Sequence, residues 1–239
     1  MSRSLGVMEV LQDLLPEWAI TVSTALSWLG DLVFIAPILA LLYFGSVATS
    51  LRRGKTERLC PDRTASLIAV VFGGLALVVL LKGVFAFPRP PTEFHAVEAS
   101  EYGFPSGHTM AATIFWGALA MWASVGSRFT RGSVVVVIVS LVAVSRLALG
   151  VHFLLDVVAS VAFGGLYLIV VAWITRWRPG RAFLIAIGVA ILGMIVTNGS
   201  SRAILALLGT IGASGGWWVV ERPSVRGRIH DRYTRLIGQ

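Results

Sequence analysis

Charged residues and cysteine are both scarce in this sequence. Charged side chains make up 13% of the 239 residues, against about 25% in a typical soluble domain, and the mean hydropathy is +0.82. The single cysteine, Cys60, excludes a disulfide within the chain. We therefore exclude an ordinary soluble protein and expect an integral membrane protein with one domain.

Acidic residues are scarcer than basic ones. The sequence holds 12 acidic and 20 basic residues, which gives a net charge of +8. A basic chain often binds nucleic acid, but here the basic residues are spread among short loops between apolar segments. We therefore expect the lipid bilayer as a partner and no nucleic acid, and the oligomeric state stays open.

Seven apolar segments approach the ~20 residues that a helix needs to cross a bilayer. They predict an all-α fold, a polytopic transmembrane helix bundle with six to seven spans. The segments cover residues 32–48, 65–87, 107–127, 134–149, 152–176, 182–197 and 203–220.

The first 30 residues have a different pattern. Val7, Leu11 and Trp18 follow helical spacing, while Glu9 and Asp13 fill the opposite face. This pattern predicts one or two amphipathic helices in the membrane interface, and the acidic residues and the lack of a basic n-region argue against a signal peptide. We therefore divide the chain into an interfacial segment (1–30), a transmembrane domain (31–220) and a basic cytoplasmic tail (221–239).

Basic residues alternate between the two sides of the predicted spans. Fifteen of the 20 lie on one side, within residues 52–63, 128–131, 176–181 and 222–235. Because cytoplasmic loops carry an excess of Lys and Arg, we expect a multi-pass cell-membrane protein with its N-terminus outside and its C-terminus in the cytoplasm. Lys82, Arg89, His108, Arg146 and His152 then all fall at the extracytoplasmic ends of their spans.

Three ionisable residues lie in one of the most apolar parts of the chain. Arg146, His152 and Asp156 fall within eleven consecutive positions, and a central Arg or Asp costs about 2.5–3.5 kcal/mol in a membrane helix. His152 and Asp156 are four residues apart, so a helix places them on one face. The carboxylate of Asp156 would accept a proton from one imidazole nitrogen and leave the other nitrogen free to attack.

Two further groups are predicted to lie at the same end. Lys82 and Arg89 flank the end of the second segment, and Ser106, Gly107 and His108 open the third. Ser106 is a natural helix N-cap, and free amides at a helix start favour an anion. Alone, each feature fits a snorkelling cation, plain capping or a polar helix contact. Together they predict a phosphate site with an activated nucleophile.

These residues give the chain a resemblance to a known family. The motifs are K-x6-R-P (Lys82, Arg89, Pro90), P-S-G-H (residues 105–108) and S-R-x5-H-x3-D (Ser145, Arg146, His152, Asp156). In this order, within residues 65–175, they resemble the type 2 phosphatidic acid phosphatase (PAP2) superfamily, which shares its site with vanadium-dependent haloperoxidases. Members commonly have six spans. The seventh segment is therefore either an appended helix, or the result of wrongly dividing the chain at residues 198–202 into two spans.

The resemblance implies a role for each residue. His152 is the catalytic nucleophile that forms a phosphohistidine, Asp156 orients it, and His108 protonates the leaving oxygen. The phosphate-binding residues are Lys82, Arg89, Ser106, Gly107 and Arg146. The family needs no metal and no cofactor, and Lys82, Arg89 and Arg146 would repel a divalent cation from this pocket.

The implied function is that of a membrane lipid phosphatase acting on a lipid phosphomonoester or diphosphate at the extracytoplasmic face. We expect a polyprenyl diphosphate to be preferred, because the chain and its loops are short, with phosphatidate or phosphatidylglycerophosphate next. Two alternatives stay open: a lipid phosphotransferase with the same site, and a non-catalytic lipid-binding or transport protein. The sequence shows no internal repeat, which disfavours a transporter.

Overall fold

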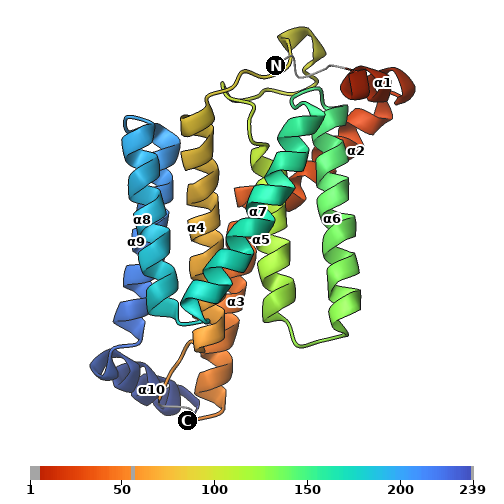
Figure 1. The fold of residues 1–239 in the computed structure, drawn as a ribbon. Coiled ribbons are helices and arrows are strands. Elements are labelled where there is room, and N and C mark those ends of the chain that lie inside the picture. The colour runs from red at the N-terminus through yellow and green to blue at the C-terminus, as the bar shows by residue number, and fades with distance from the viewer. Residues whose placement is uncertain (1–5, 55–56, 238–239) are drawn as a thin grey trace.

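The fold is a bundle of α-helices. The computed structural model describes residues 6–54 and 57–237, and these residues form ten α-helices and two short 3-10 helices (Figure 1). Within these residues, β-pairing is limited to one isolated bridge between Pro88 and Tyr102. Arg3 and Lys55, which entered the count of basic residues, lie outside the described part of the chain.

Six helices are long and apolar enough to cross a membrane, which confirms the predicted polytopic bundle. They are α3 (Leu32–Arg52), α4 (Asp62–Phe85), α6 (Arg128–Ala148), α7 (Leu154–Thr175), α8 (Pro179–Val196) and α9 (Ser201–Val220). A seventh helix, α5 (Gly107–Trp122), lies among them and has only 16 residues. The division after residues 198–202 is correct, because a turn with positive φ at Asn198 and Gly199 separates α8 from α9.

The third predicted segment ends earlier than expected. Residues 107–127 were predicted as one span, but α5 stops at Trp122 and α6 already begins at Arg128. Ser127 causes this early start, because its side chain accepts a hydrogen bond of 3.0 Å from the amide of Thr130 and caps α6. Polar capping therefore sets this boundary, where hydropathy alone placed it wrongly.

Helix α4 is the centre of the bundle, and it packs against α5, α8 and α9. Two adjacent glycines allow this close approach. A Cβ on Gly73 would lie 2.5 Å from the hydroxyl of Tyr167, and one on Gly74 would lie 2.6 Å from a methyl of Ile114. The Tyr167 hydroxyl donates a hydrogen bond of 2.7 Å to the carbonyl of Val70 and fixes α7 on α4.

The N-terminal segment forms two helices, α1 (Gly6–Leu14) and α2 (Trp18–Ser27), with a break at Pro16 and a short helix η1 (Trp28–Gly30). Both helices pack on α6, and η1 packs on α5. Met8 of α1 is fully buried. The segment therefore belongs to the packed bundle, in addition to any role as a surface anchor.

The predicted site residues gather at one end of the bundle. The C-terminal ends of α4 and α6, the start of α7, the α8–α9 turn and α1 all lie at this end, which is the upper end in Figure 1. The opposite end carries the α3–α4, α5–α6 and α7–α8 connections and α10 (Pro223–Ile237). The basic loops and the cations of the site therefore lie at opposite ends of the molecule.

Candidate active site

A cavity of about 840 Å³ opens at the end of the bundle where the predicted site residues gather. Six of the eight residues predicted from the motifs line it: Lys82, Arg89, Gly107, His108, Arg146 and His152. The remaining two, Ser106 and Asp156, lie behind this wall and are fully buried. Residues 86–106, which we call the cover loop, connect α4 to α5, and Arg89 and residues 98–102 of this loop line the cavity.

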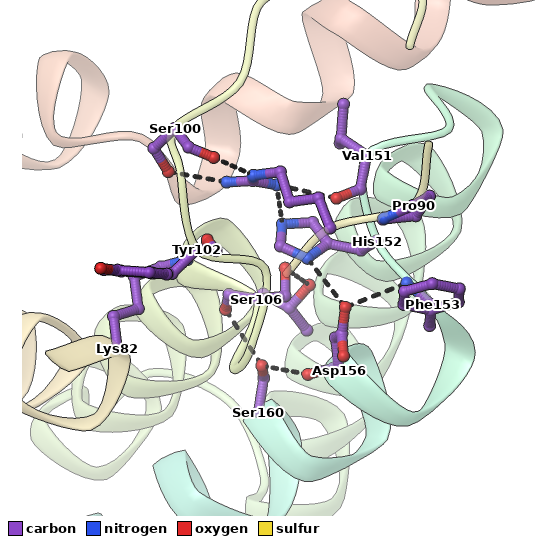
Figure 2. Close-up of polar contacts among 12 residues, drawn as sticks. Lys82, Pro90, Ser100, Tyr102, Ser106, Val151, His152, Phe153, Asp156 and Ser160 are labelled. Atoms are coloured by element: carbon purple, nitrogen blue, oxygen red, sulfur yellow. Dashed lines mark hydrogen bonds and ion pairs between the residues drawn. The ribbon is translucent and has the colours of Figure 1, made fainter. Parts of the chain in front are cut away.

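His152 and Asp156 form a buried pair at the start of α7. Nδ1 of His152 lies 3.4 Å from Oδ2 of Asp156, and both side chains are almost fully buried. The same carboxylate oxygen accepts a hydrogen bond of 3.0 Å from the amide of Phe153, the N-cap of α7 (Figure 2). The same carboxylate oxygen of Asp156 therefore caps α7 and orients the imidazole of His152.

Arg89 contacts the other nitrogen of His152. Its Nη1 lies 3.1 Å from Nε2 of His152 and donates a hydrogen bond of 2.7 Å to the carbonyl of Val151. Its Nη2 donates a hydrogen bond of 2.7 Å to the hydroxyl of Ser100, and its Nε donates one to the carbonyl of Ser100. Because a guanidinium only donates, Nε2 of His152 must accept, and the ring proton must sit on Nδ1, facing Asp156.

Burial keeps the nucleophile candidate uncharged. His152 lies between α6 and α7, and its burial, together with the nearby cations Arg89, Lys82 and Arg146, lowers its pKa well below the usual range. Burial also lowers the pKa of Arg89 to about 10, so this residue remains a cation at neutral pH. The site therefore combines a neutral imidazole with fixed positive charge around it.

Arg146 is a buried cation with an unused donor. Its side chain is 5% exposed and lines the cavity. Its Nε atom is buried and has no hydrogen-bond partner among the described residues. An unpartnered buried donor is costly, so the guanidinium of Arg146 is destabilising in the substrate-free protein.

Lys82 also lines the cavity, and its Nζ donates a hydrogen bond of 2.7 Å to the carbonyl of Tyr102 in the cover loop. Gly107 lies close by, since a Cβ there would lie 3.4 Å from Cε of Lys82. Gly107 also begins α5, and the first amides of a helix have no carbonyl partner within it. Lys82 and these amides therefore provide donors on one side of the cavity.

Ser106 holds the expected N-cap position but not the expected hydrogen bond. Its hydroxyl pairs with the hydroxyl of Thr109 at 3.0 Å and caps no backbone amide. Its own amide donates to the carbonyl of Asp156 at 3.2 Å, and Ser160 bonds both residues' carbonyls (Figure 2). Ser106 therefore joins α5 to α7 behind the cavity.

Two residues that the sequence interpretation left out also lie at the site. Oδ2 of Asp31 is 3.1 Å from Nε2 of His108, and Arg202 lines the cavity from the start of α9. An acidic residue directly before the first apolar segment was the only sequence signal for Asp31. Arg202 had already been counted among the basic residues of this side, without a role.

The comparisons with known proteins address this arrangement. A sequence model of the PAP2 superfamily matches residues 63–180, which contain all three motifs. The chain belongs to the PAP2 superfamily. As a PAP2 protein with this site it is a phosphatase, and the matched region covers α4 to α7 and the first residues of α8.

Two solved structures resemble the PAP2 fold of this chain. The first is a transmembrane PAP2-type phosphatidylglycerolphosphate phosphatase from Bacillus subtilis, with a TM-score of 0.60 and 26% identity over 72% of this chain and 84% of the other. The second is LpxE from Aquifex aeolicus, with a TM-score of 0.51 and 19% identity over 71% and 94% of the two chains, which supports the fold alone. No protein of curated function matches the sequence.

Proposed function

We propose that this PAP2 protein hydrolyses a lipid phosphate through a phosphohistidine on Nε2 of His152. The observation that carries the proposal is the pair of contacts that the two ring nitrogens of His152 make. Its Nδ1 is 3.4 Å from the Asp156 carboxylate, and its Nε2 faces the cations of the cavity. A neutral imidazole with one nitrogen held by a carboxylate is an activated nucleophile at the other nitrogen.

The reaction then has two balanced steps. Nε2 of His152 attacks the terminal phosphorus, and the P–N bond forms as the P–O bond to the leaving oxygen breaks. His108 gives its proton to that oxygen, which stays on the lipid of a monophosphate or on the lipid monophosphate of a diphosphate. A water molecule then attacks the phosphohistidine, His108 takes a proton from it, and phosphate leaves with His152 restored. Lys82, Arg89 and Arg146 stabilise the phosphoryl oxygens, the role that positive charge plays in phosphoryl transfer.

A lipid diphosphate is the substrate that the cavity supports best. Beyond the motif cations, it is lined by Arg202 and by the polar side chains of Asn198 and Ser200. These residues provide donors for a second phosphate next to the one under attack. Glu98 and Glu101 of the cover loop line the cavity as well. A phosphatidylglycerophosphate or phosphatidate is the next candidate, since a similar solved structure is a phosphatidylglycerolphosphate phosphatase.

The Arg202→Ala variant tests the diphosphate preference. Because Arg202 would contact only the second phosphate, we expect kcat/KM for a polyprenyl diphosphate to fall about tenfold, the effect of one lost charge-assisted hydrogen bond. The value for the matching monophosphate should change less than twofold. Arg232→Ala, an exposed arginine of α10, is the matched control, and equal losses for both substrates would count against a second phosphate site.

Phosphate release by purified protein in detergent tests the function itself. The panel consists of a polyprenyl diphosphate, phosphatidate, phosphatidylglycerophosphate and a water-soluble phosphate, each with EDTA present. We expect release from at least one lipid and no loss with EDTA, because the cations of the site take the place of a metal. Transfer of phosphate to a second lipid without release would favour a phosphotransferase, and a loss with EDTA that added metal restores would contradict the metal-free reaction.

We also propose that the cavity faces the extracytoplasmic side, since the basic loops lie at the opposite end and cytoplasmic loops favour Lys and Arg. Cys60 cannot report this, because it is fully buried. In a Cys60→Ser background, Thr92→Cys in the cover loop should react with an impermeant maleimide in intact cells. Ser224→Cys in α10 should react only after permeabilisation, and the reverse pattern would contradict the proposed orientation.

A further inference from the structure

The connection between α2 and α3 is built against the catalytic helix α5. Trp116 of α5 donates a hydrogen bond of 2.9 Å from Nε1 to the carbonyl of Leu29. A Cβ on Gly30 would lie 2.2 Å from the carbonyl oxygen of His108, so only glycine fits there. These contacts hold the backbone on both sides of the connection against α5, and they therefore fix Asp31 next to the His108 side chain.

Both carboxylate oxygens of Asp31 have a partner. Oδ1 accepts a hydrogen bond of 2.8 Å from the amide of Val33 and caps α3. Oδ2 lies 3.1 Å from Nε2 of His108. The side chains of Asp31 and His108 are 33% and 30% exposed, and the hydrogen bond with His108 holds the pKa of the Asp31 carboxyl below its usual range. Asp31 is therefore an anion with a fixed position.

His108 needs such an anion to act as an acid. Lys82, Arg89 and Arg146 line the same cavity, and like charges disfavour a protonated imidazole. A carboxylate at Nε2 opposes this effect. It also fixes a proton on Nε2, because a carboxylate accepts only, and leaves Nδ1 as the nitrogen that exchanges a proton with the leaving oxygen.

We infer that Asp31 is the positioning residue of His108: it holds the imidazole with Nε2–H toward the carboxylate, so that Nδ1 delivers the proton to the leaving oxygen. The inference rests on the proposed function, in which His108 is the general acid. Asp31 lies outside residues 63–180, the part of the chain that the PAP2 superfamily model covers. The site thus has two His–Asp pairs, one for the nucleophile and one for the acid.

The simpler explanation is that Asp31 only caps α3. An asparagine also caps helices well, so Asp31→Asn keeps the cap and removes the charge. The leaving group separates the two explanations. Phosphatidate releases its diacylglycerol as an alkoxide that needs a proton, whereas p-nitrophenyl phosphate releases a stable phenolate that needs none. A residue that acts through the acid therefore affects only the first substrate.

The test compares both substrates in the full-length enzyme in detergent. For Asp31→Asn we expect kcat on phosphatidate to fall about 10- to 100-fold, as for other residues that orient a catalytic group, and kcat on p-nitrophenyl phosphate to fall less than threefold. His108→Gln should show the same selectivity, and adding Asp31→Asn to it should cause no further loss. Asp13→Asn, an exposed acid of α1, should leave both rates unchanged.

Equal losses on both substrates, or a further loss in the double variant, would overturn the role of Asp31 while the phosphatase activity stands. Asp31→Ser supplies a second variant, since serine caps α3 but is too short to reach His108, and it should reproduce the asparagine result. A wild-type enzyme that releases phosphate from none of the lipids of the panel, the polyprenyl diphosphate included, would instead overturn the proposed function, and the inference with it.

Discussion

Replacement of His152 by alanine is expected to lower phosphate release by about 10⁴-fold or more, the scale of losing a catalytic nucleophile. The variant keeps the cations of the cavity and loses the imidazole whose Nε2 bonds phosphorus. Because the imidazole is buried, alanine also leaves a small cavity, so the melting temperature must be measured alongside the rate. Phosphate release by wild type and variant on the same lipid checks the prediction.

Two further observations make this result specific. His95→Ala is the matched control, because His95 lies in the cover loop, bonds the carbonyl of Pro90 at 3.0 Å and does not line the cavity. Its rate should stay within threefold of wild type. Rapid quenching with a radiolabelled substrate should trap an alkali-stable, acid-labile phosphoenzyme in wild type and none in His152→Ala. Activity retained in the variant would contradict the phosphohistidine mechanism.

Arg146→Met should separate activity from stability. Methionine fills similar space without a charge. Because the variant lacks one strong hydrogen-bond donor to the phosphoryl oxygens, we expect kcat to fall by about three orders of magnitude. The melting temperature in detergent should stay equal or rise, because a buried cation whose Nε has no partner is costly in the substrate-free protein. Phosphate release and thermal unfolding of the purified variant measure the two effects.

Binding of orthovanadate, an analogue of phosphate, completes the test of Arg146. It should raise the melting temperature of wild type and not that of Arg146→Met, since only a ligand that binds the folded state stabilises it. Arg128→Met, an exposed position at the start of α6 at the opposite end, controls for loss of charge alone. A clear fall in the melting temperature of Arg146→Met, together with the fall in activity, would show that Arg146 is structural.

The sequence predicted the helices well, because helices depend on local patterns. The apolar segments set the spans. The spacing of His152 and Asp156 predicted their contact but not its geometry: α7 begins at Leu154, so His152 precedes the helix and meets the carboxylate that caps it. The hydroxyl of Ser106 was predicted wrongly, since Thr109 competes for it at 3.0 Å. Local rules do not show which of two polar partners a buried side chain chooses.

Asp31 and Arg202 could not be predicted for a different reason. Asp31 is 77 residues from His108 in the sequence, and their contact depends on how Leu29 and Gly30 dock on α5. Arg202 reaches the cavity because the α8–α9 turn packs beside the end of α4. In both cases tertiary packing brings together residues that share no motif.

The short helix α5 determines how far the reacting phosphate must travel from the membrane surface. A Cβ on Gly107 would contact Lys82 and Val78, so α5 begins level with these residues, about 5–10 Å below the last residue of α4 at 1.5 Å per residue. A lipid headgroup must therefore sink beneath the rim of the bundle before it can react. We expect the thickness of the surrounding bilayer to regulate turnover, because a thinner membrane lowers the headgroup plane toward His152 and a thicker one raises it away.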